Sequence, residues 1–251
     1  MRITPELAEM AGIHAGDGYL RYAGRRKEID ISGGVDEKEY YDTHVIPLFN
    51  NFFGLDIQGR LFLTRNTYGF VIRNKRIIQI FKKLGFPSGK KSTIVKCPTI
   101  IQNSSDFGIL RRFIRGYFDT DGSLTFDKKI FLQDAFKKTK NFYPRLMFTC
   151  ASRNLTEDFL KIVHKLGFKA TCSVHCPKKT TESIRYKMQL VGVKNLNKWI
   201  KEIGTKNPTK YSRYLIWKKF GFCPPNTTYK QRINILKGNL NPHSLYVGPV
   251  V

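Results

Sequence analysis

Two Asp-Gly pairs are the residues of this chain best placed to do metal chemistry. The dipeptide occurs only at Asp17-Gly18 and Asp121-Gly122, and a glycine stands five residues before each aspartate. Each pair ends a predicted helix, where the negative end of the helix dipole disfavours a carboxylate by about 0.3–1 kcal/mol. A divalent cation between two such carboxylates would relieve that cost and their mutual repulsion, and oxygen ligands suit Mg²⁺. The matched pair therefore predicts metal-assisted hydrolysis of a phosphodiester, although a single Asp-Gly is typical of an ordinary helix-to-hairpin turn.

The two predicted helices that end at these pairs carry small residues on one face, four positions apart. Small residues at this spacing let two helix backbones approach closely. If the two faces pack together, Asp17 and Asp121 end up side by side near a pseudo-two-fold axis. The predicted interface residues are Gly12, Gly16, Gly116 and Thr120.

The elements that must position these helix ends occur twice along the chain. Hydrophobic periodicity and turn residues predict the order helix, hairpin, helix, hairpin, helix in each half, with a helix over 36–53 that Pro47 could kink and a further helix over 211–220. The simplest interpretation is an α+β fold of tandem pseudo-symmetric αββαββα repeats with two central packed helices. The predicted division is residues 1–88 for the first repeat, 89–105 for a linker, 106–204 for the second repeat and 205–251 for a basic C-terminal extension.

The charge of the chain points to a polyanionic partner. Its 251 residues contain 44 Lys and Arg against 19 Asp and Glu, which gives a net charge of +25. The basic residues are spread among Tyr, Phe, Thr and Ser, a pattern that favours nucleic acid over a membrane surface. The 41% hydrophobic content excludes intrinsic disorder, and no apolar run is long enough for a transmembrane helix. Without a secretory signal or a disulfide framework, the five cysteines predict free thiols in a reducing compartment, cytoplasmic or organellar, and not a secreted protein.

Two nine-residue segments carry a resemblance to a known family. Residues 10–18 read MAGIHAGDG and residues 114–122 read IRGYFDTDG. They resemble the two motifs of single-chain LAGLIDADG homing endonucleases, and the similarity extends over about residues 5–220. The first segment departs from the motif, because Ala15 replaces its usual first acid and His14 stands where an apolar residue is usual.

The resemblance implies roles for individual residues. Asp17 and Asp121 are expected to bind Mg²⁺ or Mn²⁺, with the carbonyls of Gly16 and Thr120 nearby. In this family, a basic residue near each scissile phosphate stabilises charge or organises water. Lysines follow the third helix of both repeats, and plain phosphate contacts or solvated side chains are the alternatives for them. The candidates are Lys90, Lys91, Lys206 and Lys210.

Alternation with a period of two sorts the predicted strands into a core face and a polar face. The core face is expected to hold Ile29, Ile31, Leu61, Leu63, Leu146, Phe148, Ala170, Cys172, Val174, Cys176, Tyr186, Met188 and Leu190. The resemblance implies that the polar faces form a saddle in the major groove, where Arg favours guanine and acids favour cytosine, although a merely solvated sheet would show the same pattern. The predicted DNA-binding residues are Arg21, Glu28, Asp30, Ser32, Arg60, Thr64, Arg145, Thr149, Thr171, Ser173, His175, Arg185, Lys187 and Gln189.

These observations predict a monomeric, site-specific double-strand DNA endonuclease of the intron-homing type that uses Mg²⁺ or Mn²⁺. Because the two polar faces differ, one chain is expected per non-palindromic site, and the loop at 128–143 should extend contacts in the second half. The alternative is a non-cleaving nucleic-acid binder on the same fold, either an RNA-splicing maturase or a DNA-binding regulator. Intron RNA is therefore a second candidate partner beside double-stranded DNA, and no membrane partner is expected.

Overall fold

The computed structural model describes residues 2–128, 140–177 and 183–246. In the first half, the helices are α1 (Pro5–Asp17), α2 (Lys38–Tyr40), α3 (Ile46–Phe53) and α4 (Lys75–Lys83), and the strands are β1 (Gly18–Arg21), β2 (Glu28–Gly34), β3 (Arg60–Phe62) and β4 (Thr67–Ile72). The linker holds a short helix that was not predicted, α5 (Thr99–Gln102). The second half contains α6 (Phe107–Asp121), β5 (Ser123–Asp127), β6 (Tyr143–Cys150), α7 (Arg153–Lys165), β7 (Thr171–His175), β8 (Arg185–Val191) and α8 (Val193–Glu202), followed by α9 (Pro208–Phe220) and α10 (Tyr229–Leu236). None of the helices within these ranges is long and apolar enough to cross a membrane.

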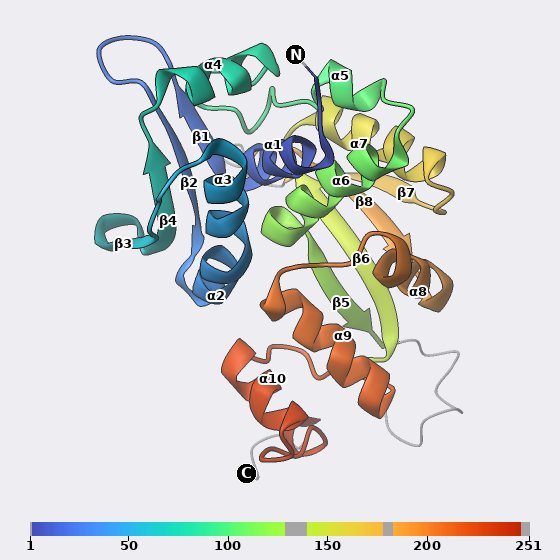
Figure 1. The fold of residues 1–251 in the computed structure, drawn as a ribbon. Coiled ribbons are helices and arrows are strands. Elements are labelled where there is room, and N and C mark those ends of the chain that lie inside the picture. The colour runs from blue at the N-terminus through green and yellow to red at the C-terminus, as the bar shows by residue number, and fades with distance from the viewer. Residues whose placement is uncertain (1, 129–139, 178–182, 247–251) are drawn as a thin grey trace.

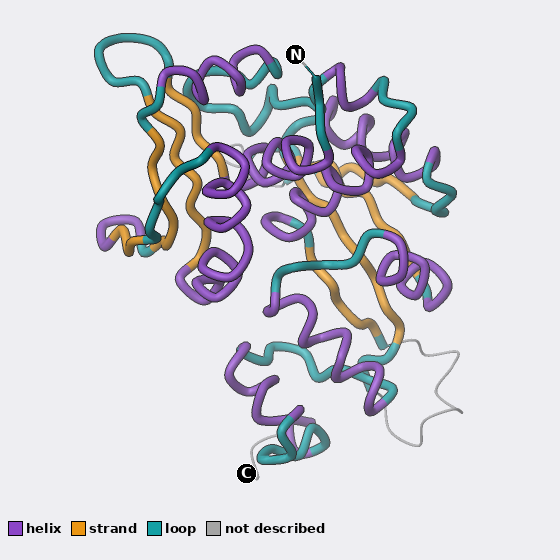
Figure 2. Tube along the Cα trace, in the orientation of Figure 1, coloured by secondary structure: helices purple, strands orange, loops and turns teal. Residues whose placement is uncertain are grey.

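Each half of the chain forms one four-stranded antiparallel sheet. The strand order is β1-β2-β4-β3 in the first sheet and β5-β6-β8-β7 in the second. The two groups of strands lie apart, and α1 and α6 lie between them in the middle of the molecule (Figures 1 and 2). In the inner strands, Ile29, Ile31, Leu146 and Phe148 are buried as predicted. The repeated order confirms the α+β fold of two tandem αββαββα units.

The helices α1 and α6 touch through their backbones. A Cβ atom added to Gly12 would lie 2.1 Å from the carbonyl oxygen of Phe113, and one added to Gly116 would lie 2.2 Å from that of Glu9. The buried Glu9 carboxylate on α1 accepts hydrogen bonds from Arg112 at 2.7 Å and from Arg115 at 2.8 and 2.9 Å, both on α6. The structure therefore brings the predicted small-residue interface together and adds a charged contact that the spacing did not indicate.

The helix predicted over 36–53 is divided by a π-helical turn. A 3-10 turn at Val35–Glu37 leads into α2, and the π turn at Tyr41–Val45 joins α2 to α3. Pro47, in the first turn of α3, has no N–H to donate to the preceding turn, and the wider π turn accommodates the missing bond. This local geometry carries Tyr41 to the end of α1, where its hydroxyl contacts Asp17.

The outer strands are more exposed than alternation predicted. All five residues of β7 are exposed, including Cys172 and Val174, and Cys176 just beyond the strand is exposed as well. Leu61 and Leu63 are 46% and 82% exposed. The prediction of a core face was wrong at Leu61, Cys172 and Val174 because β3 and β7 are edge strands. Leu63 and Cys176 lie just beyond the ends of these strands, so the alternation does not apply to them.

The C-terminal extension is folded further than the sequence predicted. The helix α9 runs beside β5, and Trp217 stacks on Phe126 with 5.9 Å between the ring centroids. The helix α10 lies outside the predicted elements. Its buried Arg232 guanidinium donates to the Ser212 hydroxyl at 2.9 Å and to the Thr209 carbonyl at 3.0 Å, which ties α10 to the start of α9.

Gly116→Ala tests the backbone contact. The new methyl group would collide with the Glu9 carbonyl, so we expect the free energy of unfolding to fall by about 1–3 kcal/mol or more. Gly108→Ala on the same helix is the matched control, since its nearest neighbour is the movable carboxylate end of Asp106 at 3.0 Å. Denaturant titration measures both, and equal effects of the two substitutions would contradict the close packing.

Candidate active site

Two aspartates end α1 and α6 side by side. Asp17 and Asp121 are the last residues of these helices, and a Cβ atom added to Gly16 would lie 3.4 Å from Cγ of Asp121. Burial, then the charges of Asp121 and Glu37, raise the pKa of Asp17 to about 7. Burial also raises the pKa of Asp121, and the charges of Lys91 and Lys210 oppose that shift. The structure thus places the predicted pair where two negative charges oppose each other.

The carboxylate of Asp17 is held by a buried tyrosine. The Tyr41 hydroxyl donates to Asp17 Oδ2 at 2.6 Å. The end of β2 leaves room for both groups, because a Cβ atom added to Gly33 would lie 2.7 Å from Asp17 Oδ2 and 3.1 Å from Cε2 of Tyr41. Among the described residues, the Asp121 carboxylate has no corresponding hydrogen-bond donor, so the two halves of the site differ.

Two lysines bind the carbonyl ends of the two helices in the same way. Lys91 Nζ donates to the Gly16 carbonyl at 2.6 Å. Lys210 Nζ donates to three carbonyls at the end of α6, including that of Thr120, at 2.6–2.8 Å. A cation here interacts favourably with the helix dipole. Burial lowers the pKa of both ammonium groups, and the nearby carboxylates oppose that shift.

The structure separates the four candidate lysines into two pairs. The side chains of Lys90 and Lys206 are exposed, and neither ammonium group has a partner among the described residues. Lys206 reaches the site only through its backbone N–H, which donates to Asp119 Oδ2 at 2.8 Å. The geometry therefore favours Lys91 and Lys210 for a role beside the carboxylates.

Three polar residues at the site were missed by the sequence analysis. Asn207 donates to Glu37 Oε1 and to the Asp119 carbonyl, both at 2.7 Å, and Glu37 Oε1 lies 4.0 Å from Lys210 Nζ. Burial raises the pKa of Asp119 to about 6, against the opposing charge of Lys210. A local sequence pattern could have identified two of them: Asp119 is an acid of the second motif, and Asn207 is the N-cap of α9 just before Pro208. No local pattern indicated Glu37, because its contacts with Asn207 and Lys210 depend on the geometry of the π turn.

A hollow of about 690 Å³ opens beside Asp121. Its lining includes Lys91 from the linker and Thr149 and Arg185 from the second sheet. A candidate catalytic lysine and two predicted DNA-binding residues therefore face the same space as one of the carboxylates.

The second sheet carries its predicted DNA-binding residues in adjacent rows on one face. The register places Thr149 opposite Lys187 and Lys187 opposite Ser173, while Gln189 lies opposite Thr171. The buried residues of β6 and β8 alternate with them and point to the helices. The same polar face also holds Arg145, His175 and Arg185.

The first sheet presents a smaller polar face. Arg21 lies opposite Glu28, and Ser32 and Arg60 both lie opposite Gly69. The placement of Thr64 on a strand was wrong, because a 3-10 turn at Leu63–Arg65 ends β3 and breaks the alternation. The residues of the predicted loop at 129–139 lie outside the described residues.

One protein-family model and several solved structures are similar to this chain. The family model of the LAGLIDADG-like domain matches residues 108–204. The second repeat therefore resembles a LAGLIDADG-like domain. Variants of the homing endonuclease I-DmoI have a similar structure, with a TM-score of 0.53 and 16% identity over 79% of this chain and 90% of that chain. I-LtrWI, a LAGLIDADG homing endonuclease bound to its target DNA, gives a TM-score of 0.52 and 11% identity over 94% of this chain and 98% of that chain.

The same LAGLIDADG fold occurs in a protein that is not described as an endonuclease. The N-terminal LAGLIDADG domain of DUF199/WhiA gives a TM-score of 0.50 and 12% identity over 80% of this chain and 81% of that chain. None of the curated proteins compared with the chain matches it. The chain therefore has the fold of single-chain LAGLIDADG homing endonucleases, and the fold alone does not decide between cleavage and binding.

The unusual histidine of the first LAGLIDADG-like segment behaves as an apolar residue. His14 is fully buried, with its ring centroid 4.9 Å from that of Phe81 and 4.5 Å from that of Phe86. Burial, and then the charge of Lys91, hold its pKa well below the usual value, so the imidazole is neutral. The neutral ring packs among aromatic side chains, and neither of its nitrogen atoms has a hydrogen-bond partner among the described residues.

The helix ends fit a divalent metal ion. In the described part of the chain, no three His, Cys, Asp or Glu side chains form a group that could hold a metal. The available donors are the carboxylates of Asp17 and Asp121 and the carbonyls of Gly16 and Thr120, which are the hard oxygen ligands that Mg²⁺ and Mn²⁺ prefer. Each carbonyl oxygen accepts from a lysine and keeps a second lone pair. Burial, followed by the charges of Asp121 and Glu37, disfavours a negative charge on Asp17, and a bound cation would stabilise that charge.

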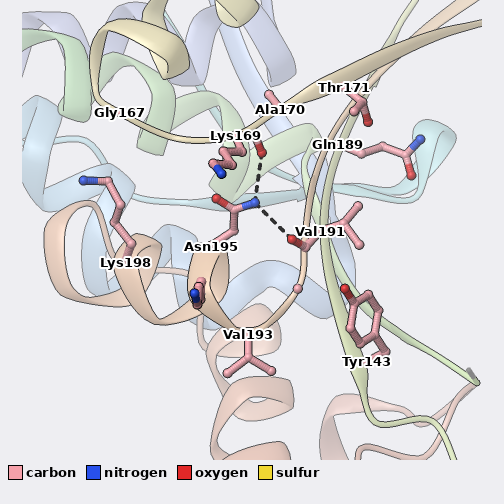
Figure 3. Close-up of a pocket in the computed structure, with 12 residues that line it drawn as sticks. Tyr143, Gly167, Lys169, Ala170, Thr171, Gln189, Val191, Val193, Asn195 and Lys198 are labelled. Carbon is pink, nitrogen blue, oxygen red and sulfur yellow. Dashed lines mark hydrogen bonds between the residues drawn. The ribbon is translucent and has the colours of Figure 1, made fainter. Parts of the chain in front are cut away.

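A second hollow, of about 620 Å³, lies at the outer edge of the second sheet (Figure 3). Thr171 and Gln189 line it together with Lys169, and Asn195 donates to the carbonyls of Lys169 and Val191 at 2.9 and 3.0 Å. Its lining contains no carboxylate and no thiol. This hollow therefore extends the basic surface of the sheet and is not a second candidate active site.

Asp17→Asn should stabilise the protein in a pH-dependent way. Because the pKa of Asp17 is raised from 3.8 to about 7, the folded chain keeps a proton that the unfolded chain releases between about pH 4 and 7, and stability falls as the pH rises through that window. We expect the free energy of unfolding of the variant to exceed that of the natural chain by on the order of 2 kcal/mol at pH 7.5 and to match it near pH 4. This difference is smaller than the full pKa shift implies, because solvent partly screens the charge. Chemical denaturation across this range measures the difference, and Asp56→Asn in an exposed loop is the control. A difference that does not change with pH would contradict the electrostatic assignment.

Proposed function

We propose that this chain is a monomeric, site-specific double-strand DNA endonuclease of the homing type that uses Mg²⁺ or Mn²⁺. The observation that carries the proposal is the meeting of Asp17 and Asp121 at the ends of two packed helices, with Lys91 and Lys210 bound beside them. The net charge of +25 supports a polyanionic substrate. Among the similar structures, an I-DmoI variant is in complex with its target DNA in the presence of Mn, and I-LtrWI is bound to target DNA.

In this proposal the helix ends hold the metal and the reacting phosphate together. Asp17 and Asp121, with the carbonyls of Gly16 and Thr120, would hold the divalent ion. When bound, that ion supplies activation of water and charge stabilisation of the leaving oxygen. The Tyr41 hydroxyl keeps the Asp17 carboxylate in one orientation.

The lysines and the sheet supply positive charge around the phosphate. Lys91 lines the hollow beside Asp121, where its ammonium group can stabilise charge on a phosphate oxygen. Arg185 and Thr149 line the same hollow from the second sheet and can position the DNA backbone. Lys210 balances the carboxylates from the opposite side.

The proposal includes one chain per site and a site that is not a palindrome. The row Ser32, Gly69 and Arg60 in the first sheet corresponds to the row Thr149, Lys187 and Ser173 in the second, so the two half-sites meet different surfaces. The five cysteines are free, which is compatible with the proposed reducing compartment, cytoplasmic or organellar.

Substitution of either carboxylate separates cleavage from binding. Asp17→Asn or Asp121→Asn should abolish metal-dependent cutting of a duplex from an intron-less copy of the surrounding gene, because a neutral amide is a poor ligand for a hard cation. Duplex affinity should stay within a few-fold, since most of the affinity comes from backbone phosphates. Cutting by both variants at near-normal rates would contradict the proposed site.

The neighbouring lysines provide a matched control in the same assay. Lys91→Met should slow cutting by on the order of 10²–10³, as removal of one charge-stabilising group typically does. Lys90→Met removes the same charge one residue away, from an exposed side chain, and should have little effect. Equal effects of the two substitutions would show that Lys91 acts only through its contribution to the net charge and not through its position at the site.

The second candidate is a non-cleaving nucleic-acid binder. It is favoured by the likeness to the LAGLIDADG domain of DUF199/WhiA. Duplex binding without metal-dependent cutting would indicate a DNA-binding regulator. Preference for structured intron RNA over duplex DNA would indicate a maturase.

A further inference from the structure

Both carboxylate oxygens of Asp30, on the polar face of β2, are already engaged within the protein. Oδ1 accepts from the Ser32 hydroxyl at 2.9 Å, and Oδ2 forms an ion pair with Arg65 at 2.9 Å. The side chain of Asp30 is 13% exposed, whereas that of Arg65 is 46% exposed. The acid therefore lies beneath the arginine, and a base edge that approaches this face meets the guanidinium group first.

The second acid of this face has the same arrangement. Glu28 Oε1 lies 3.5 Å from Arg21, and Glu28 Oε2 lies 3.3 Å from Arg73. Its side chain is 12% exposed, below those of both arginines. All four carboxylate oxygen atoms of Glu28 and Asp30 have an Arg or Ser partner within the protein, so the predicted contact of these acids with cytosine would compete with that pairing.

Arg65 is fixed in a way that suits recognition of a base. It stands in the 3-10 turn after β3, with its guanidinium carbon 4.3 Å from the centroid of the Phe62 ring and one nitrogen on Asp30. The remaining N–H groups of the planar fork can form the two parallel hydrogen bonds that guanine O6 and N7 accept in the major groove. A side chain held by a ring and a carboxylate loses little conformational entropy on binding.

We infer that Arg65 is a specificity-determining residue that reads a guanine in the half-site under the first sheet, and that Asp30 is a positioning residue for Arg65. The inference rests on the proposed binding of duplex DNA and assigns the chemistry of one base position. It does not depend on cleavage.

Site selection from a randomised duplex library, without divalent metal, tests the inference on the full chain. The natural chain should enrich one guanine that Arg65→Lys no longer requires, with the preference at that position reduced roughly 10–100-fold and the others retained. Asp30→Asn should relax the same position. Arg153→Lys is the matched control, since this arginine forms an ion pair with Glu157 on α7, away from the sheet face, and its side chain is 72% exposed.

Combining the two substitutions separates positioning from independent contacts. If Asp30 acts through Arg65, the double variant should be no less selective at that position than Arg65→Lys alone. Loss of a cytosine preference in Asp30→Asn would overturn the inference. A second contradicting result would be that Arg65→Lys weakens binding equally for every base at every position while its melting temperature is unchanged, because this indicates a phosphate contact. Failure of the natural chain to enrich any duplex would instead defeat the proposed function itself.

Discussion

The backbone contact between α1 and α6 is the constraint on which the rest of the structure depends. Gly12 and Gly116 allow an approach that leaves no room for a side-chain atom between the helices. Because this contact fixes where both helices end, Asp17 and Asp121 must lie together. The first strand of each sheet starts within two residues of those aspartates, so the same contact also places the two sheets on either side of the centre.

The paired carboxylates at the two helix ends destabilise the fold, and two nearby lysines offset much of this effect. Two carboxylates at helix C-termini are disfavoured by each other, by the dipoles and by burial. Lys91 and Lys210 bind the adjoining carbonyls and counter this charge, yet the raised pKa of Asp17 shows that the balance is incomplete. In the proposed function, a divalent cation bound by the two carboxylates would supply the remaining positive charge.

Sequence patterns predicted what local rules determine and missed what tertiary packing decides. The matched Asp-Gly pairs, the small-residue faces and the alternation at Ile29 and Phe148 are local signals, and the structure follows them. Exposure of Leu61 could not be predicted, because it depends on which strand lies at the edge of the sheet. Likewise, only the folded chain distinguishes Lys91 from Lys90, or shows that Asp30 is covered by Arg65.

The most direct test of the central claim is the position of bound metal. Anomalous diffraction from crystals of the full chain soaked in Mn²⁺ should show density at the carboxylates of Asp17 and Asp121, and this density should be lost in Asp121→Asn. A map without density at these helix ends, or density that persists when both aspartates are replaced by asparagine, would contradict the account.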